Sequence, residues 1–306
     1  METEFLAWLA QRLPPHPNLR LGAGDDAAVL RLGAGGDCVV TVDLLTDGVD
    51  FRLGETSLER IGRKALAVNL SDLAAMAARP LAAVVALALP YQGALEAAVG
   101  IYEGLLPLAE RYQTAIAGGD TNTWHGPLAI SVTLIGEPTE RGVLRRDGAR
   151  PGDAIVVTGD FGGSILGKHF DFEPRVAAAL LLNERYELHA GMDVSDGLSL
   201  DLARLCQASG CGADLDLSAI PIAAAAHTLA QLRRDGKTPL DHALSDGEDF
   251  ELLLAAPASV ARQMVHDHPL DVPVSIIGQF VADRGLWQVT PTGERLALAP
   301  RGFLHN

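Results

Sequence analysis

The sequence predicts an α/β (α+β) protein with two domains, and three observations support this. The chain has 306 residues, which is long for a single hydrophobic core. Strand-like segments with β-branched or alternating apolar residues are interspersed with segments of helical periodicity. A polar stretch rich in turn-forming residues, 145–153, separates two such series. We therefore expect one domain over residues 1–145 and a second over 146–306.

Composition places the chain among ordinary globular proteins. Apolar residues make up 48% and charged residues 21%. No apolar run reaches the ~18 residues of a membrane-spanning helix, and the acidic start Met1-Glu-Thr-Glu-Phe-Leu does not resemble a signal peptide. These features predict a cytoplasmic protein that does not enter a membrane. Cys38, Cys206 and Cys211 match no zinc spacing, and we expect them to be reduced and structural.

The net charge of −15 limits the partners that the chain can bind. A nucleic-acid-binding protein would need a basic stripe, so we expect no nucleic-acid partner. An acidic protein can still bind phosphorylated small molecules when metal ions bridge the two negative parties. We interpret the acids within short motifs as functional and much of the remaining charge as a solvated surface.

The first candidate site residues lie at the start of the chain. Gly24-Asp-Asp26 precedes an apolar strand and either presents carboxylates in a tight turn or forms an ordinary polar turn. In the strand 38–44, alternation places Thr41 and Asp43 on one face. If the two strands pair, these oxygen atoms form a pocket of the kind that Mg²⁺ prefers. Asp50, in the following loop, faces either a substrate or solvent.

A helix over 56–78 is the segment around which the chain is organised. Leu66, Leu70 and Leu73 form an apolar stripe along it, and Pro80 ends it. Asn69 and Asp72 share a face of this apolar segment. An ionised aspartate there is costly unless a hydrogen bond or a cation compensates, so Asp72 makes either a local hydrogen bond or a metal contact.

The remainder of the first half predicts a strand, a helix and two further strands. The apolar run 81–89 is typical of a strand buried on both faces. A helix follows over 94–112, with these side chains expected to face inward: Leu95, Val99, Tyr102, Leu106 and Ala109. The strand 114–122 is expected to end at two glycines and Asp120, where a phosphate approaches the backbone and its metal binds the carboxylate. Residues 128–136 alternate as a strand.

In the second half, the clearest motif is Asp193-Val-Ser-Asp-Gly-Leu198. Asp193 and Ser195 share a strand face, and we expect Ser195 or Asp196 to cap a helix beginning near Leu198. Such a helix N-terminus binds phosphate well, although a capped helix alone would explain the same residues. The glycine-rich stretch 158–164 lacks the pattern of a phosphate-binding loop or of a dinucleotide-binding fingerprint, which favours a plain connection.

Two residues near the C-terminus are candidate substrate contacts. Glu248 lies in an acidic turn that leads into a strand, and Phe303 either stacks on a ring or packs against the protein. The nine histidines lack the His-Glu-x-x-His spacing of zinc enzymes, and no Ser-His-Asp arrangement follows from local order.

In this order the motifs resemble the thiamine-monophosphate kinase family, within the aminoimidazole ribonucleotide synthetase-like superfamily. The matching segments cover nearly the whole chain: Gly24-Asp-Asp26, Thr41-Val-Asp43, Asn69-Leu-Ser-Asp-Leu-Ala-Ala-Met76, Gly118-Gly-Asp-Thr121, Asp193-Val-Ser-Asp-Gly-Leu198 and Gly247-Glu-Asp-Phe-Glu-Leu252. The resemblance implies an N-terminal mixed sheet with helices on one face and a C-terminal α/β sandwich. It also implies a homodimer in which the N-terminal sheets join into a barrel.

The resemblance further implies transfer of the γ-phosphate of ATP to thiamine monophosphate, assisted by several Mg²⁺ ions, to give thiamine diphosphate. The residues at metal positions are Asp26, Thr41, Asp43, Asp72, Asp120, Asp193 and Asp196. Those at ATP positions are Gly119, Asp120, Arg146 and Ser195, and those at substrate positions are Asp50, Glu248 and Phe303. The chain departs from the family pattern at Val42, Asp50 and Asp246. At these positions the family usually has a hydroxyl residue, a histidine and a glycine, respectively.

Transfer between two phosphates needs positioning and neutralisation of negative charge more than covalent participation by the protein. We therefore expect direct in-line transfer without a phosphorylated enzyme. Two alternatives remain open from the sequence. One is another ATP-dependent synthetase of the superfamily, acting on an amide or formyl group. The other is a non-catalytic nucleotide- or metal-binding regulator that kept the fold.

Overall fold

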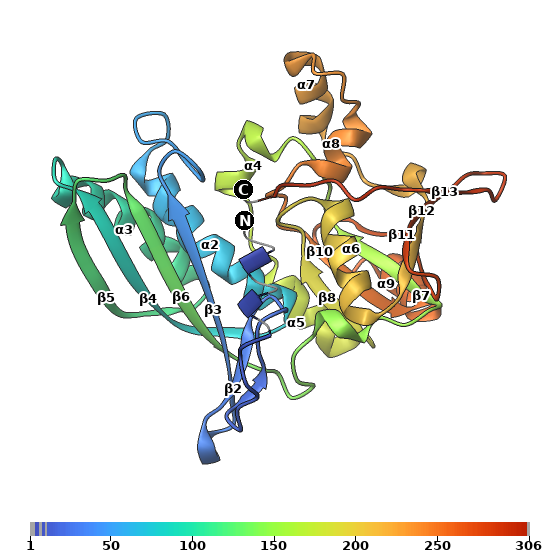
Figure 1. Ribbon diagram of the computed structural model, residues 1–306, viewed down its shortest axis with the longest axis horizontal. Helices are drawn as coiled ribbons and strands as arrows, with labels where there is room; N and C mark the ends of the chain where they lie inside the picture. Colours follow the sequence, from blue (N-terminus) through green and yellow to red (C-terminus); the bar gives the residue numbers. More distant parts are fainter. Residues whose placement is uncertain (1–3, 6–7, 10, 305–306) are drawn as a thin grey trace.

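The computed structural model describes residues 4–5, 8–9 and 11–304, with the backbone alone at Ala34. Two mixed sheets lie on either side of a central helix, α2 (Leu58–Ala75) (Figure 1). The first sheet and its helices come from the N-terminal half, and the second from the C-terminal half. The predicted α/β class is confirmed.

The N-terminal sheet has six strands in the order β1-β2-β3-β6-β4-β5. Its neighbours are antiparallel except for β4 and β5, which are parallel. The helices α2 and α3 (Ala94–Arg111) lie on one face of this sheet (Figure 1). The strands span Leu19–Leu21, Ala28–Arg31, Asp37–Thr46, Arg79–Pro90, Ala115–Trp124 and Ala129–Glu137 for β1 to β6.

The C-terminal sheet has seven strands in the order β13-β12-β9-β11-β7-β10-β8, and only β12 and β9 pair in parallel. For β7 to β13 the strands span Asp153–Thr158, Ala190–Asp193, Gly212–Leu215, Leu252–Pro257, Val274–Val281, Gly285–Val289 and Arg295–Ala297. The longer helices of this half are α5 (Val176–Arg185), α6 (Leu198–Ser209), α7 (Ala224–Arg233), α8 (Pro239–Ser245) and α9 (Ala258–Asp267). Short helical turns lie at Gly33–Gly35, Arg146–Gly148, Ser164–Leu166, Lys168–Asp171 and Leu217–Ala219.

Both faces of the C-terminal sheet are covered by helices. Val156 and Leu254 pack into the core that contains α2, α5 and α9, whereas Ile155 and Leu253 pack into a second core with α6. Side chains alternate between the two faces along each strand, which explains why neighbouring residues enter different cores. The arrangement is the α/β sandwich that was expected.

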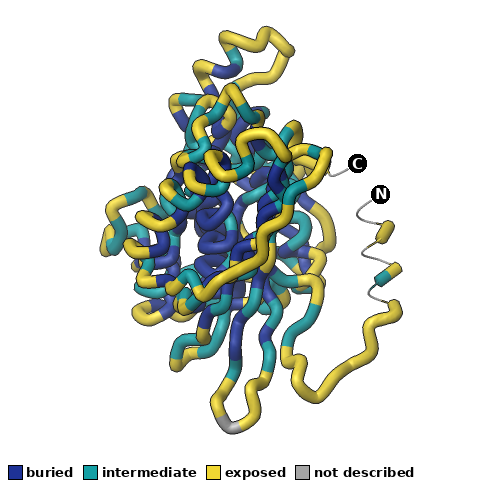
Figure 2. The backbone as a smooth tube through the Cα atoms, turned by 90° about the vertical axis from the view of Figure 1, so that its left-hand side faces the viewer, coloured by how far each residue is buried: buried dark blue, intermediate teal, exposed yellow. Residues whose placement is uncertain are grey.

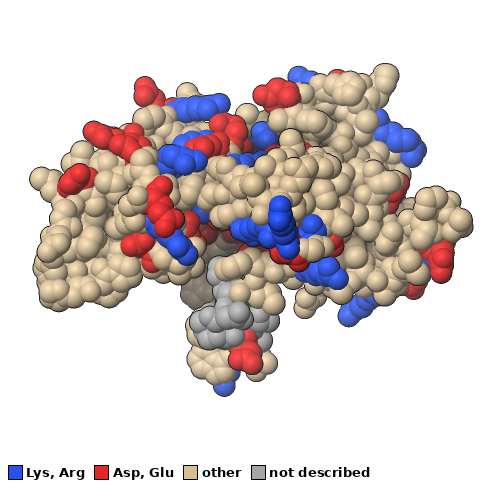
Figure 3. All heavy atoms as spheres, turned by 90° about the horizontal axis from the view of Figure 1, so that it is seen from above, with Lys and Arg blue, Asp and Glu red and all other residues tan. Residues whose placement is uncertain are grey.

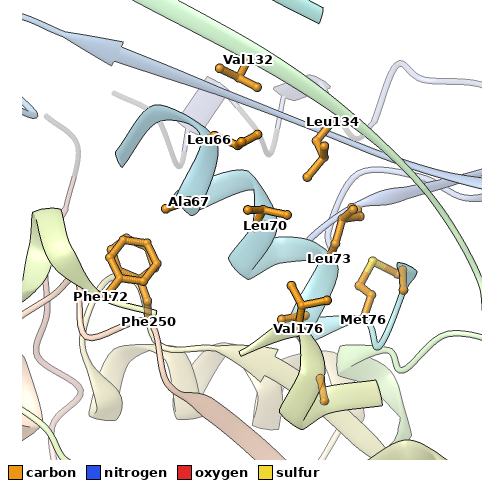
Figure 4. Close-up of a cluster of buried hydrophobic side chains, with 14 of the residues drawn as sticks. Leu66, Ala67, Leu70, Leu73, Met76, Val132, Leu134, Phe172, Val176 and Phe250 are labelled. Carbon is orange, nitrogen blue, oxygen red and sulfur yellow. The ribbon is translucent and has the colours of Figure 1, made fainter. Parts of the chain in front are cut away.

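The helix α2 is buried on nearly every side, and the first core passes through it without a break from one sheet to the other. In Figure 4, three leucines of α2 approach two side chains of β6: Leu66, Leu70 and Leu73 on the helix, and Val132 and Leu134 on the strand. Figure 2 shows that the buried backbone lies in the interior of the molecule. A helix that is apolar around most of its circumference is stable only with such two-sided packing. Because α2 contacts both sheets, it positions the two halves against each other.

The predicted inward face of α3 was wrong at three of its five residues, whereas Ala109 is buried and Tyr102 packs against the core as predicted. Leu95 is 79% exposed and Val99 and Leu106 are also exposed, while Ile101 and Leu105 are buried instead. The reason is a close approach of α3 to α2. A Cβ atom at Gly62 would lie 1.8 Å from the carbonyl oxygen of Ile101, and one at Gly104 would lie 1.7 Å from that of Glu59. The glycines therefore select the contact face, and apolar periodicity alone did not reveal it.

Two expectations about the N-terminal sheet were also wrong. The strand β4 is not buried on both faces, because Leu81 and Val84 are exposed. Gly118, Gly119 and Asp120 lie inside β5, the edge strand, rather than at its end. Val42 and Leu44 of β3 are exposed as well, so an apolar sheet face opposite α2 is uncovered within this chain.

The predicted division at 145/146 lies in the connection between β6 and β7 and stays a prediction. Among the described residues, every helix is too short or too polar to cross a lipid bilayer.

Candidate active site

Three carboxylates meet where the two halves of the chain adjoin. Asp26 lies in the turn before β2, Asp72 on α2 and Asp193 at the end of β8. Oxygen atoms of all three lie within 4.8 Å of one another. Three carboxylates at this separation, two from the first half and one from the second, form a donor set suited to a hard divalent cation.

Two hydrogen bonds, each with one partner on α2, hold Asp72 and Asp193 in place. The Thr41 hydroxyl donates a hydrogen bond of 2.5 Å to Asp72, and the Ser71 hydroxyl donates one of 2.5 Å to Asp193. Thr41 points toward α2 because alternation along β3 places Val42 on the opposite, exposed face, as predicted. Positions 71 and 72 of one helix thus contact both domains.

Burial, together with repulsion between neighbouring acids, disfavours ionisation of Asp43, Asp72 and Asp193. Burial, followed by repulsion from Asp43, Asp193 and Asp26, raises the pKa of Asp72 well above its usual value. Burial and the charge of Asp26 likewise raise the pKa of Asp193. Burial and Asp50 raise the pKa of Asp43 to about 6, and its Oδ2 atom is buried without a hydrogen-bond partner. An unpartnered buried carboxylate oxygen beside the cluster is a site that a cation would satisfy.

Arg146 is the cation that faces this cluster in the structure. Its Nη2 and Nε atoms lie 2.5 and 3.0 Å from the two carboxylate oxygens of Asp26, and its backbone N–H donates to Asp25. A bidentate guanidinium of this kind also suits a phosphate group. Arg146 therefore lies where it can exchange a carboxylate partner for a phosphate.

A cavity of about 670 Å³ extends from the cluster between the domains. Asp43, Asp72 and Asp193 line one part of it. The predicted substrate residues Asp50, Glu248 and Phe303 line it too, as do Ser195 and Asp196. The volume lies within the range of small-molecule sites. On the face shown in Figure 3, Lys and Arg side chains are interspersed with Asp and Glu and form no continuous basic stripe.

The structure does not bring every predicted residue to this cavity. Gly119 and Asp120 lie on the edge strand β5 and do not line it. The predicted cap of α6 was wrong, because Gly197 occupies that position and Asp201 accepts the backbone N–H bonds of residues 196 and 197. The Asp196 carboxylate pairs with Arg204 instead.

Sequence reasoning missed two residues that belong to the site. Ser71 binds Asp193, and Lys64 lines the cavity. Lys64, Val68 and Asp72 follow one another at intervals of four residues and so lie on one face of α2. A lysine on the same helix face as Asp72, in an otherwise apolar segment, was the signal that could have identified it.

Sequence profiles of the AIR synthase related protein family match residues 24–137 for the N-terminal domain and 150–287 for the C-terminal domain. A thiamine-monophosphate kinase of Rhodopirellula baltica is 47% identical over 314 residues, which span all of this chain and 98% of that protein. The chain belongs to the thiamine-monophosphate kinase family.

Solved structures agree with this membership of the thiamine-monophosphate kinase family. A thiamine-monophosphate kinase structure from Stenotrophomonas maltophilia is 35% identical, covers 96% of each chain and gives a TM-score of 0.74. A structure described as AaThiL complexed with AMPPCP and TMP is 25% identical, with a TM-score of 0.82 over 98% of this chain and 96% of that one. Both domains of this chain therefore have counterparts in the family fold.

The raised pKa values predict that the metal-free protein becomes less stable as pH rises. An acid whose pKa is raised from 3.8 to about 6, as for Asp43 and Asp25, binds more protons folded than unfolded between those values. Its stabilising contribution is therefore complete at low pH and is lost as pH rises toward 6. We expect the free energy of unfolding, measured by urea denaturation in EDTA, to fall between about pH 4 and 6 and to go on falling at higher pH, because the pKa values of Asp72 and Asp193 are raised well above their usual value. Adding 10 mM Mg²⁺ should reverse the fall.

The matched variant is Asp72→Asn, which keeps the side-chain shape and an acceptor for Thr41. Removing one of the mutually repelling charges should stabilise the metal-free protein at pH 8 by about 1–2 kcal/mol and weaken the response to Mg²⁺. A variant that is less stable than the wild type at pH 8, with an unchanged Mg²⁺ response, would contradict this account of the cluster.

Proposed function

We propose that this chain transfers the γ-phosphate of ATP to thiamine monophosphate and forms thiamine diphosphate. The observation that carries the proposal is the single cavity in which carboxylates from both domains meet acidic and aromatic side chains suited to the acceptor. A crowded transfer between two phosphates needs such a charged, pre-organised junction. Membership of the thiamine-monophosphate kinase family supports the same reaction.

The donor set fits Mg²⁺. The cluster offers carboxylate oxygens, a threonine hydroxyl and an orphaned Asp43 oxygen, and Mg²⁺ prefers oxygen ligands of this kind. The residues that would hold several ions are Asp26, Thr41, Asp43, Asp72, Asp120, Asp193 and Asp196. Bound Mg²⁺ supplies neutralisation of the phosphate charges and fixes their relative orientation.

The side chains around the cluster divide between the two substrates. Arg146 exchanges Asp26 for an ATP phosphate, and the Ser195 segment and Gly119-Asp120 complete the nucleotide site. On the acceptor side, Glu248 and Asp50 face the cationic thiazolium, and the exposed ring of Phe303 packs against a heterocycle. The acceptor phosphate then points toward the carboxylate cluster, where the γ-phosphate is transferred.

Transfer proceeds in line, without a phosphorylated protein intermediate. Asp26 is bound by Arg146, Asp72 by Thr41 and Asp193 by Ser71. These carboxylates are accounted for as ligands, and the proposal assigns none of them as a nucleophile.

A homodimer completes the site. Val42, Leu44, Leu81 and Val84 expose apolar surface on the open face of the N-terminal sheet, and a second copy of that face would cover it and close a barrel. Asp120 lies on the same sheet, outside its own chain's cavity. In the dimer, Gly119 and Asp120 of one chain reach the cavity of its partner.

The reaction is tested with purified protein, Mg²⁺-ATP and thiamine monophosphate, following ADP and thiamine diphosphate together. We expect one thiamine diphosphate for each ADP, because the γ-phosphate is captured by the acceptor. ADP and free phosphate without thiamine diphosphate would point instead to a synthetase of the superfamily. Absence of ATP turnover would leave the non-catalytic regulator.

The shared site is tested by mixing two inactive variants, Asp72→Asn and Asp120→Asn. Mixed dimers contain one site with both aspartates intact, so co-expression should restore about a quarter of wild-type activity. Asp72→Asn mixed with Asp193→Asn is the matched control and should stay inactive, because these residues come from the same chain. Equal activity in the two mixtures would overturn the trans arrangement.

A further inference from the structure

Lys64 is a buried cation at the acceptor end of the cavity. Only 1% of its side chain is exposed, yet it belongs to the cavity lining. Its Nζ atom lies 2.5 Å from Glu248 Oε1 and donates a 3.0 Å hydrogen bond to the backbone carbonyl of Asp50. One ammonium group thus contacts both of the acidic residues assigned to the acceptor.

We propose that Lys64 is a positioning residue for thiamine monophosphate, acting by fixing Glu248 and the Asp50 loop on opposite sides of the acceptor. The inference rests on the proposed kinase function and extends it to a residue that neither motif nor resemblance assigned. Lys64 lies on α2, Asp50 in the N-terminal loop and Glu248 in the C-terminal domain. The ammonium therefore sets the distance between the two acceptor walls.

The backbone around Glu248 is fixed by contacts that do not involve the Glu248 side chain. Glu248 and Phe250 have φ angles of 62° and 51°, in the left-handed region that non-glycine residues rarely adopt. The surrounding chain is held by bonds from Gly162 N–H to Asp249 and from the Ser164 hydroxyl to the carbonyl of Gly247. These bonds fix the backbone and leave the Glu248 carboxylate, with 34% of its side chain exposed, to be oriented by Lys64.

Stability alone explains this pair poorly. Burying an ammonium group is costly, and a buried ion pair often stabilises a fold no better than apolar residues of similar volume. Lys168 offers a structural comparison in the same protein. It also binds a glutamate, Glu251, and a backbone carbonyl, that of Asp160, but it lies outside the cavity lining. Lys64 differs from it by contacting both walls of the acceptor site.

The first test compares Lys64→Met with Lys168→Met in the steady-state kinase assay. If Lys64 positions the acceptor, Lys64→Met should raise the KM for thiamine monophosphate by about tenfold or more and leave the KM for ATP within about twofold. Lys168→Met should leave both KM values near those of the wild type. An unchanged acceptor KM in a folded Lys64→Met protein would overturn the proposal, as would equal increases in both KM values.

The second test asks whether Lys64 acts through Glu248. In the Glu248→Gln background, adding Lys64→Met should raise the acceptor KM by well under the tenfold expected in the wild-type background, because the Glu248 carboxylate is already gone and only the contact with the Asp50 carbonyl is left to lose. A further tenfold increase would overturn the proposal. This comparison remains usable if Lys64→Met alone does not fold, since the double variant leaves no unpaired glutamate charge.

Failure of this inference differs from failure of the proposed function. A wild-type protein that forms no thiamine diphosphate overturns the proposed function, and with it the role of Lys64. An active wild-type protein whose acceptor KM is insensitive to Lys64 overturns only the role of Lys64.

Discussion

The desolvation and mutual repulsion of a carboxylate cluster are the constraint on which the rest of this structure depends. Oxygen atoms of Asp26, Asp72 and Asp193 approach within 4.8 Å, and burial together with the neighbouring negative charges raises the pKa of Asp72 and of Asp193 well above its usual value. The protein keeps them together by packing α2 between two sheets and by bonding Thr41 and Ser71 to the acids. Packing of the core thus keeps the carboxylates close together, although their ionisation is unfavourable there. Bound divalent cations would offset that cost.

The central position of α2 links the fold to the chemistry. One side of the helix forms the apolar core with Leu66 and Leu70. Another carries Lys64, Val68 and Asp72 at four-residue intervals into the cavity. The spacing between Asp72 and Lys64 is therefore set by the rise of a single rigid helix rather than by the connection between the two halves of the chain. Such placement on a rigid element suits a reaction that depends on positioning two phosphates.

Sequence patterns identified what depends on local geometry. Strand alternation placed Thr41 toward the site and Val42 away from it, and the apolar context of Asp72 indicated a compensated charge. Patterns failed where the outcome depended on a distant partner. The glycines at 62 and 104 decided which face of α3 is buried, and Asp201 replaced the expected cap of α6. Asp120 lies outside the lining of the cavity in its own chain. We propose that it reaches the cavity of a second chain, and no local sequence pattern encodes such a contact.

The role of the carboxylate cluster is tested directly by locating divalent cations on the protein. Crystals grown with Mn²⁺ and a non-hydrolysable ATP analogue would be measured for anomalous scattering at the manganese edge. We expect Mn²⁺ to bind Asp72 and at least one of Asp26 and Asp193, with Arg146 released from Asp26 and turned to a phosphate. Cations bound elsewhere, with the Arg146–Asp26 pair intact beside bound nucleotide, would contradict this expectation.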